Sequence, residues 1–225
     1  MTLTPDCVLV YSGGMDSTVL LYDLVSQGRH PAALSFDYGS RHNARELPLA
    51  AETCQKLGVG HQIISLGFME KLFSSALLKN GPAIPDGQYQ QENMALTVVP
   101  FRNPILMGIS VGYAESIGAG EVLLASHGGD HALYPDCRKD FNQAFDLAVR
   151  LGTDGKVRLA FPYENLDKKE IANIGRRLKV DFSRTWTCYK GEAIHCGVCS
   201  ACRERMDALG RKDGLDPTLY QAGNK

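Results

Sequence analysis

The chain has 225 residues, of which 44% are hydrophobic, and it carries 24 Lys and Arg against 25 Asp and Glu. This size and composition are typical of one globular domain with at most a small extension. A net charge of −1 argues against general nucleic-acid binding, and no apolar stretch is long enough to span a bilayer. Because the N-terminus also lacks a secretion signal, we expect a cytoplasmic protein that binds neither nucleic acid nor membrane.

Short apolar runs alternate with longer amphipathic stretches, which is the pattern of a parallel sheet covered by helices. Strands are expected at 8–11, 32–37, 61–66, 121–126 and 157–161. Helices are expected at 18–26, 44–57, 104–117, 140–151 and 168–178. The sequence therefore predicts an α/β, Rossmann-like fold with helices on both faces of the sheet.

Three segments fall outside this alternation. Residues 80–93 are rich in Gly, Pro and Gln and are expected to form a long loop, of the kind that often covers a site. Residues 126–138 follow a strand and carry many polar groups, at the end of the sheet where open α/β folds bind ligands. We expect residues 1–180 to form a nucleotide-binding α/β domain, and 181–225 to be a cysteine-rich appendage of the same compact domain.

A glycine-rich turn, S-G-G-M-D-S at residues 12–17, joins the first strand to the first helix. Its two glycines allow a sharp turn and a close approach of backbone N–H groups, and the helix adds its positive end. The turn is neither a Walker A loop nor a dinucleotide fingerprint. Asp16 supplies a carboxylate suited to a Mg²⁺ ion on pyrophosphate. The turn is thus predicted to bind phosphate; the alternative is an ordinary strand-to-helix turn.

The turn resembles the signature of the PP-loop ATP pyrophosphatases. That resemblance implies an adenine nucleotide alpha hydrolase-like fold and an enzyme that adenylates a carboxylate or carbonyl. Pyrophosphate leaves first, and a nitrogen or sulfur nucleophile then displaces AMP. Asp16 and Ser17 are expected to act in catalysis. The expected nucleotide-binding residues of the turn are Tyr11, Ser12, Gly13, Gly14, Met15, Asp16, Ser17 and Thr18.

Four of the seven cysteines, Cys188, Cys196, Cys199 and Cys202, lie within fifteen residues near the C-terminus. Two successive two-residue gaps allow neighbouring sulfurs to bind one ion. A closed tetrahedral zinc site of structural character is the first interpretation, and an iron–sulfur cluster is the alternative. His195 is a spare potential ligand. The remaining cysteines, Cys7, Cys54 and Cys137, are scattered and are expected to be buried packing residues.

With the cysteine-rich tail included, the resemblance narrows to the QueC family, the 7-cyano-7-deazaguanine synthases, and covers the whole chain. These enzymes convert 7-carboxy-7-deazaguanine, ammonium and ATP into a nitrile for queuosine biosynthesis. The resemblance implies one structural zinc per subunit on the four cysteines, and a homodimer. The matching motifs are S-G-G-M-D-S at 12–17, F-D-Y-G-S-R-H at 36–42, V-P-F-R-N at 99–103, Y-P-D-C-R at 134–138, K-K-E-I at 168–171, T-W-T-C-Y at 185–189 and C-G-V-C-S-A-C at 196–202.

Several further residues are expected to contact the substrates. Phe36 and Tyr38 suit an adenine pocket, although Phe36 would also suit the core. Arg41 and His42 are placed to reach the nucleotide or the deazaguanine, or are solvated loop residues. Arg102 is a candidate catalytic residue before a helix that Asn103 would cap.

The deazaguanine itself calls for two kinds of group. Asp136, or alternatively Asp130, is the expected acceptor for the ring N–H groups, and Arg138, or alternatively Lys190, the expected partner of its carboxylate. Two features differ from the family pattern and are expected near the substrate, namely Phe101 and the loop at 128–133.

Two other functions remain open at this stage. A PP-loop tRNA sulfurtransferase would use an iron–sulfur cluster and Cys137, and would be brown. A zinc-ribbon interaction module on a catalytically inactive fold would show no ATP turnover. A chain of this length has no room for a glutaminase domain, so free ammonium is the expected nitrogen source. The sequence leaves open whether AMP or ADP is the final nucleotide product.

Overall fold

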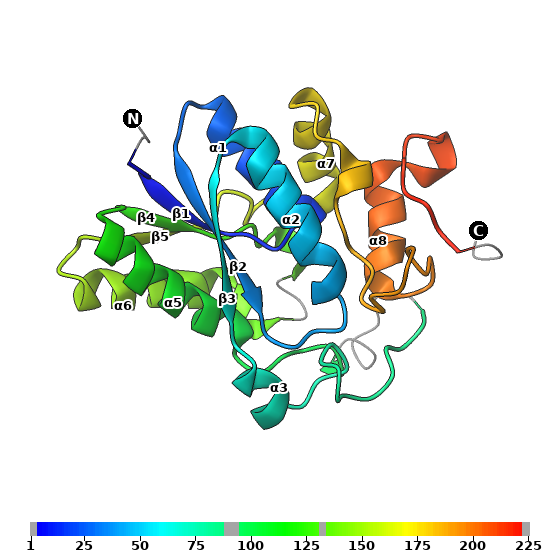
Figure 1. Cartoon of the computed structure of the whole chain (residues 1–225), viewed down its shortest axis with the longest axis horizontal. Coiled ribbons are helices and arrows are strands. Elements are labelled where there is room, and N and C mark those ends of the chain that lie inside the picture. The colour runs from blue at the N-terminus through cyan, green and yellow to red at the C-terminus, as the bar shows by residue number, and fades with distance from the viewer. Residues whose placement is uncertain (1–3, 88–94, 131–133, 222–225) are drawn as a thin grey trace.

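Five parallel strands form the sheet of the computed structural model, which describes residues 4–87, 95–130 and 134–221 (Figure 1). The strands are β1 (Cys7–Val10), β2 (Pro31–Asp37), β3 (Gly60–Ser65), β4 (Glu121–Leu123) and β5 (Arg158–Ala160). Their order is β3-β2-β1-β4-β5, and each neighbouring pair is parallel. The order reverses between β1 and β4, and a crevice forms at the carboxyl ends of strands at such a reversal.

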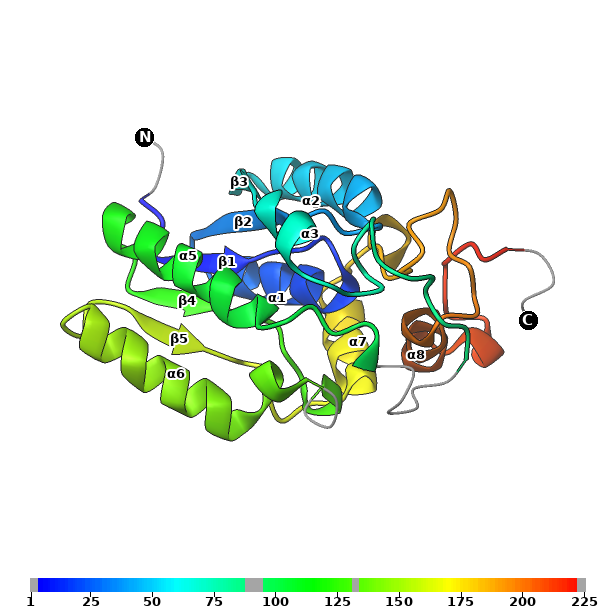
Figure 2. The ribbon, with the colours of Figure 1, turned by 90° about the horizontal axis from the view of Figure 1, so that it is seen from below.

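Helices cover both faces of the sheet, as the two perpendicular views show (Figures 1 and 2). The described α-helices are α1 (Met15–Ser26), α2 (Asn43–Leu57), α3 (Phe68–Leu72), α5 (Arg102–Ile117), α6 (Lys139–Gly152), α7 (Lys168–Arg177) and α8 (Ser200–Leu209), of which α8 lies beyond α7, away from the sheet (Figure 2). Within the described ranges, none of these helices has both the length and the apolar character that crossing a membrane requires.

Alternate residues of β1 belong to two different cores, because successive side chains of a strand point to opposite faces. Val8 and Val10 pack in the cluster that contains α5 residues such as Met107. Leu9 packs in the cluster that contains Val19 of α1 and Ile171 of α7. The centre of the sheet is therefore buried on both faces, which explains why β1 and β2 are apolar runs without polar alternation, whereas the edge strand β3 is largely exposed.

The predicted parallel α/β fold is confirmed, with differences at the ends of elements. α1 begins at Met15, three residues earlier than predicted, so the glycine turn leads directly into its first turn. β4 ends at Leu123, not at residue 126, and the following residues line a cavity. α3 has five residues, too few to show a helical period.

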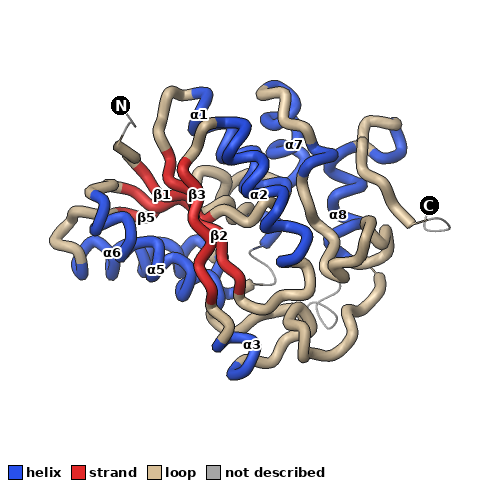
Figure 3. The backbone as a smooth tube through the Cα atoms, in the orientation of Figure 1, coloured by secondary structure: helices blue, strands red, loops and turns tan. Residues whose placement is uncertain are grey.

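The chain after Asp181 packs against the start of the fold. The backbone N–H of Trp186 donates a hydrogen bond of 3.1 Å to the carbonyl of Gly13. Ala208 and Leu209 of α8 belong to the same core cluster as α1 and α7. Much of this tail is irregular chain around one helix (Figure 3). The C-terminal residues thus form one wall of the crevice at the reversal of strand order.

The fully buried side chain of Arg205 holds this irregular chain together. Its guanidinium donates hydrogen bonds to the hydroxyls of Thr185, Thr187 and Thr218 and to the carbonyl of Phe182. A buried guanidinium needs this many acceptors because burial without hydrogen bonds is costly. One side chain on α8 therefore joins three separate segments of the tail.

Candidate active site and metal centre

A cavity of about 240 Å³ lies at the carboxyl ends of β1 and β4, where the strand order reverses. The glycine turn forms one end, and the ends of β2 and α5 form the other. Residues 124–127 after β4, the first turn of α2, Lys168 of α7 and the tail from Trp186 to Tyr189 complete the walls. The cavity is therefore assembled from nearly the whole length of the chain.

The glycine turn is closed by its own serines. The Ser12 and Ser17 hydroxyl oxygens lie 3.0 Å apart, and the Gly14 N–H donates to Ser12 Oγ at 3.1 Å. Gly13 has a φ of +80°, and a Cβ there would lie 2.6 Å from the Glu46 carbonyl oxygen. This position therefore requires glycine for its backbone conformation and for the close packing of α2.

The structure brings most of the predicted nucleotide-binding residues to the cavity. Those that line it are Tyr11, Ser12, Gly14, Met15, Asp16, Ser17 and Phe36. Gly13 and Thr18 lie behind this lining, where the Thr18 hydroxyl is 3.2 Å from the Tyr11 hydroxyl. Arg41 donates instead to the carbonyls of Ala76 and Gly81. The binding roles of all these residues stay predictions.

A charged network surrounds Asp16 at the start of α1. Its Oδ2 lies 3.4 Å from Lys168 Nζ and 3.9 Å from His127 Nε2. Lys168 Nζ lies in turn 2.6 Å from Glu204 Oε2 on α8. Neither Lys168 nor His127 was assigned a role from the sequence. The family motif at 168–171 and the polar segment after the fourth strand were the signals that pointed to them.

Three buried polar atoms at this cavity have no hydrogen-bond partner among the described residues. They are Asp16 Oδ1, His42 Nδ1 and Ser126 Oγ, and all three residues line the cavity. Buried polar groups in folded proteins are almost always paired. Their grouping around one cavity is the arrangement expected of a site that binds a polar ligand.

Arg102 lies at the opposite end of the cavity, beside Tyr38. Burial alone would lower the pKa of its guanidinium, but the nearby Tyr38, Cys137 and Asp136 raise the pKa above its usual value. Arg102 therefore stays a cation in an otherwise enclosed place. Its Nε also donates to Asn103 Oδ1 at 3.1 Å, which fixes the side chain in a cavity that suits an anionic group.

The other predicted substrate residues lie outside the cavity lining. Asp136 accepts a hydrogen bond of 3.1 Å from the backbone N–H of Asn103, near the start of α5, and Arg138 is exposed at the start of α6. Lys190 pairs with Asp86 at 2.7 Å. The side chain of Asp130 and residues 88–93 and 131–133 of the two predicted loops lie outside the described residues. Phe101 is exposed, so it is a surface residue beside the cavity.

His42 and Glu46 face the cavity from the start of α2. Burial raises the pKa of Glu46 to about 8, although the charge of Arg102 acts to lower it. Burial and the same positive charge lower the pKa of His42 to about 4. His42 was among the residues predicted to reach the substrates, whereas Glu46 was not, because no short motif marked it as a site residue.

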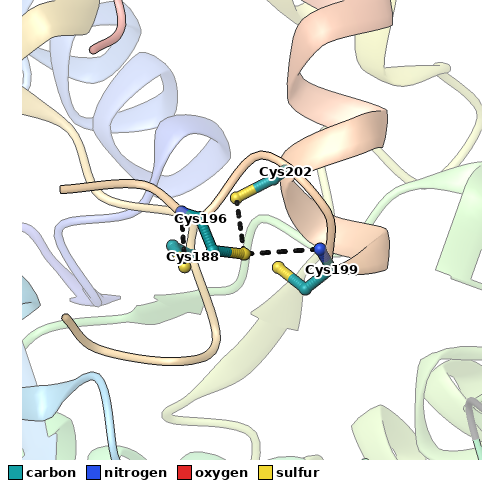
Figure 4. A group of neighbouring side chains, drawn as sticks. All are labelled: Cys188, Cys196, Cys199 and Cys202. Carbon is teal, nitrogen blue, oxygen red and sulfur yellow. Dashed lines mark hydrogen bonds between the residues drawn. The ribbon is translucent and has the colours of Figure 1, made fainter. Parts of the chain in front are cut away.

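The four clustered cysteines form the predicted metal site (Figure 4). All four are buried and free of disulfide bonds, and their sulfur atoms lie within 4.8 Å of one another. The Cys196 and Cys202 sulfurs are 3.9 Å apart, close to the roughly 3.8 Å edge of a tetrahedron with metal–sulfur bonds of about 2.3 Å. The donor set and its geometry therefore fit one tetrahedral metal ion.

Backbone groups support this arrangement of sulfurs. The N–H of Cys196 points to Cys188 Sγ, and the N–H of Cys199 points to Cys196 Sγ, each at 3.4 Å. The pKa of Cys196 is lowered by its neighbouring thiols while those of Cys199 and Cys202 are raised, so four thiolates at this place would need a cation among them. His195 packs its ring 4.2 Å from that of Trp186 and accepts from the Thr187 N–H, so it is not part of the four-sulfur group.

Comparisons with known proteins agree with this geometry. The family model described as queuosine biosynthesis protein QueC matches residues 6–213. The chain is 57% identical over 215 residues to a 7-cyano-7-deazaguanine synthase of Desulfotalea psychrophila, covering 96% of this chain and 98% of that protein. It is 49% identical over 216 residues to one of Porphyromonas gingivalis, covering 96% and 97%. The solved NMN synthetase of Francisella tularensis has a similar fold, with a TM-score of 0.52 and 17% identity over 97% of this chain and 80% of that one.

Proposed function

Because the chain belongs to the QueC family of 7-cyano-7-deazaguanine synthases, we propose that the cavity at the reversal of strand order carries out both activations needed to make a nitrile. The enzyme is an ATP-dependent ligase of queuosine biosynthesis. In the first activation, the carboxylate of 7-carboxy-7-deazaguanine attacks ATP and ammonia then displaces AMP to give an amide. In the second, the amide oxygen is adenylated and leaves with AMP, so that the nitrile forms.

The observation that carries this proposal is the grouping of partnerless buried atoms in the cavity. Asp16 Oδ1 lies at the start of α1, which follows β1, and Ser126 Oγ lies just after β4, so the two atoms flank the reversal of strand order. His42 Nδ1 lies on the third wall. A nucleotide and a deazaguanine carry many polar groups, so they are ligands that would satisfy these atoms.

We assign the phosphates of ATP to the end of the cavity formed by the glycine turn. The first N–H groups of α1 and the hydroxyls of Ser12 and Ser17 suit phosphate oxygens. Lys168 adds a positive charge on the same side, so negative charge on the departing pyrophosphate is stabilised as it develops. Asp16 would hold a Mg²⁺ ion, which would supply further positive charge to the phosphates.

We assign the acidic end of the deazaguanine to Arg102. Its guanidinium is half-buried in the cavity wall, while Arg138 is exposed and Lys190 is paired with Asp86. A guanidinium can bind both oxygens of a carboxylate and orient it toward ATP. Asp136 stays the predicted acceptor for the ring. Calorimetry of Asp136→Asn that showed unchanged deazaguanine affinity would remove it from that role.

We propose zinc as the metal of the four-cysteine site. Four thiolates in a closed tetrahedral arrangement leave no open position for water, so the metal would supply folding energy and no chemistry. It would hold the tail against the glycine turn.

We propose a cytoplasmic homodimer. The cluster of reduced thiols suits the cytoplasm, and the homodimer implied by the family stays a prediction that sedimentation can test. We also propose that residues 1–180 and residues 181–225 are two parts of one folding unit.

The test of the proposed function is mass spectrometry of the products formed from ATP, ammonium and 7-carboxy-7-deazaguanine. We expect the amide to appear first and the nitrile to replace it, with the released nucleotide quantified in the same samples. Absence of both products would contradict the proposal. A brown protein with visible absorption would instead favour the sulfurtransferase with an iron–sulfur cluster.

A further inference from the structure

Glu46 is the one carboxyl of the cavity wall that the roles assigned above do not use. It belongs to the first turn of α2, and its side chain is 15% exposed. A Cβ on Gly14 would lie 3.8 Å from Glu46 Oε1, which places the carboxyl beside the glycine turn. The positive charge of Arg102, which lines the other end of the cavity, is close enough to act on the Glu46 carboxyl. Glu46 therefore lies between the phosphate end and the end assigned to the substrate carboxylate, where the two must meet.

His42 lies one turn earlier on the same wall. Its ring packs against that of Tyr189, and Nδ1 is buried without a partner among the described residues. A neutral imidazole has one acceptor nitrogen, and we assign that role to Nδ1. Nε2 also lies 3.6 Å from Glu46 Oε2, too far for a direct hydrogen bond.

The two side chains thus offer acceptors and no donor to the cavity when Glu46 is ionised. Such a pair suits a small cation that donates hydrogen bonds in several directions. Ammonium is the one substrate of the proposed reaction with that character. It must also lose a proton before its nitrogen can attack, so a carboxylate beside it would serve binding and proton transfer together.

Resting on the proposed function, we propose that Glu46 and His42 form the ammonium subsite and that Glu46 accepts the protons that the nitrogen loses. Ammonium passes one proton to the Glu46 carboxylate. Ammonia then attacks the carbonyl carbon of the acyl adenylate, so a C–N bond forms and the C–O bond to phosphate breaks. AMP leaves with that electron pair, and the nitrogen gives up its second proton to water.

The same carboxylate serves the second activation once it has returned its proton to solvent. The amide oxygen attacks the α-phosphorus of a second ATP, and pyrophosphate leaves. The amide nitrogen then loses its two protons, one to Glu46 and one to water. As the C–O bond breaks, AMP departs with the oxygen and the C≡N bond is complete. A carboxyl with a raised pKa is a stronger base than an ordinary one and suits these steps.

The test separates proton transfer from adenylation in Glu46→Gln. Exchange of labelled pyrophosphate into ATP, dependent on 7-carboxy-7-deazaguanine, reports the first activation alone, and we expect it to change little. Amide formation from ammonium at neutral pH should fall by about 100-fold or more. Hydroxylamine is a neutral nucleophile at this pH, so hydroxamate formation should fall far less. The matched control, Glu52→Gln on the exposed side of α2, should match the parent in every assay.

The outcomes distinguish the inference from the function on which it rests. A parent enzyme without substrate-dependent exchange would refute the proposed function. A parent with exchange, together with a Glu46→Gln variant that forms the amide at the parent rate or loses ammonium and hydroxylamine activity equally, would overturn the inference alone. If Glu46→Gln does not fold, Glu46→Asp replaces it, with the expectation that ammonium-dependent rates fall while exchange persists.

Discussion

The Glu46 carboxyl makes the stability of the protein depend on pH in a defined window. Its pKa rises from an ordinary 4.5 to about 8 on folding, so the folded chain binds a proton more tightly than the unfolded chain. Stability linked to this group is therefore present below pH 4.5 and is lost as pH rises toward 8.

The first prediction concerns the Glu46→Gln variant, which has no group to ionise. Relative to the parent, it should unfold at a higher temperature at pH 8.5 and at a similar temperature at pH 4.5. Each pKa unit is worth about 1.4 kcal/mol, so the difference at high pH should reach a few kcal/mol. Calorimetric scans across this range measure it. Parallel curves for the two proteins would contradict the raised pKa.

Gly13 and Gly28 allow a second test at single residues, because both have positive φ but different surroundings. A Cβ on Gly13 would lie 2.6 Å from the Glu46 carbonyl oxygen, whereas one on Gly28 meets nothing within 4 Å. Gly28→Ala should cost about 1 kcal/mol of unfolding free energy from backbone strain. Gly13→Ala should cost about 2 kcal/mol more and weaken ATP binding. Urea unfolding measures the free energy of both variants. Equal losses of free energy would show that the packing of α2 does not require glycine at residue 13.

The site residues that could be predicted from the sequence are those that lie together in one short segment. Ser12 to Ser17 and the four cysteines each lie within a short segment, so spacing alone indicates their chemistry. Glu46 became visible only in the fold, and Lys168 and Ser126 lay within marked segments but received a role only there, because each contributes to the site through residues distant in the chain. Asp136 and Arg138 show the reverse case, since their sequence position suggested the substrate while their side chains lie outside the cavity lining.

At the scale of elements, Lys168 is important because it begins α7 and touches two other helices. It bridges Asp16 of α1 and Glu204 of α8. We predict that Lys168→Gln lowers kcat/KM for ATP by about 100-fold, because it removes a charge expected on the phosphates. Lys169→Gln changes an exposed neighbour and should leave this constant within about twofold of the parent. A comparable loss of kcat/KM in both variants would contradict the assignment of Lys168 to the phosphates of ATP.

The elements that periodicity predicted are the long ones. α2 and α6 repeat apolar positions over several turns, and α5 is a long apolar run that begins near a proline, so the existence of all three followed from the sequence. The ends of these helices did not follow from the sequence, because the local conformation of the capping residues decides them. Before α5, for example, Phe101 has a left-handed backbone conformation with a φ of 52°. α8 was hidden, since its buried face includes Cys202 and Arg205, which hydrophobic patterns do not mark.

At the scale of the whole molecule, the metal site is expected to hold the tail against the glycine turn. We predict one zinc per chain, and that removal by a chelator lowers the unfolding temperature and increases amide exchange of residues 185–202. Cys199→Ser should lose the metal, whereas Cys54→Ala, which removes a buried thiol of the other core, should retain it. Metal analysis and hydrogen exchange measure these outcomes. Unchanged exchange after complete metal loss would contradict the role of the site as a clamp.

The contact between Trp186 and Gly13 also has a consequence for synthesis on the ribosome. The turn at residues 12–17 is among the first parts of the chain to be made, while Trp186 and Glu204, which complete its surroundings, are made near the end. A nascent chain therefore carries an unfinished nucleotide site until translation is almost over. A chain truncated after residue 180 should fail to retain ATP in equilibrium dialysis, and retention would show that the turn alone suffices. We therefore expect a partly made chain to bind no ATP.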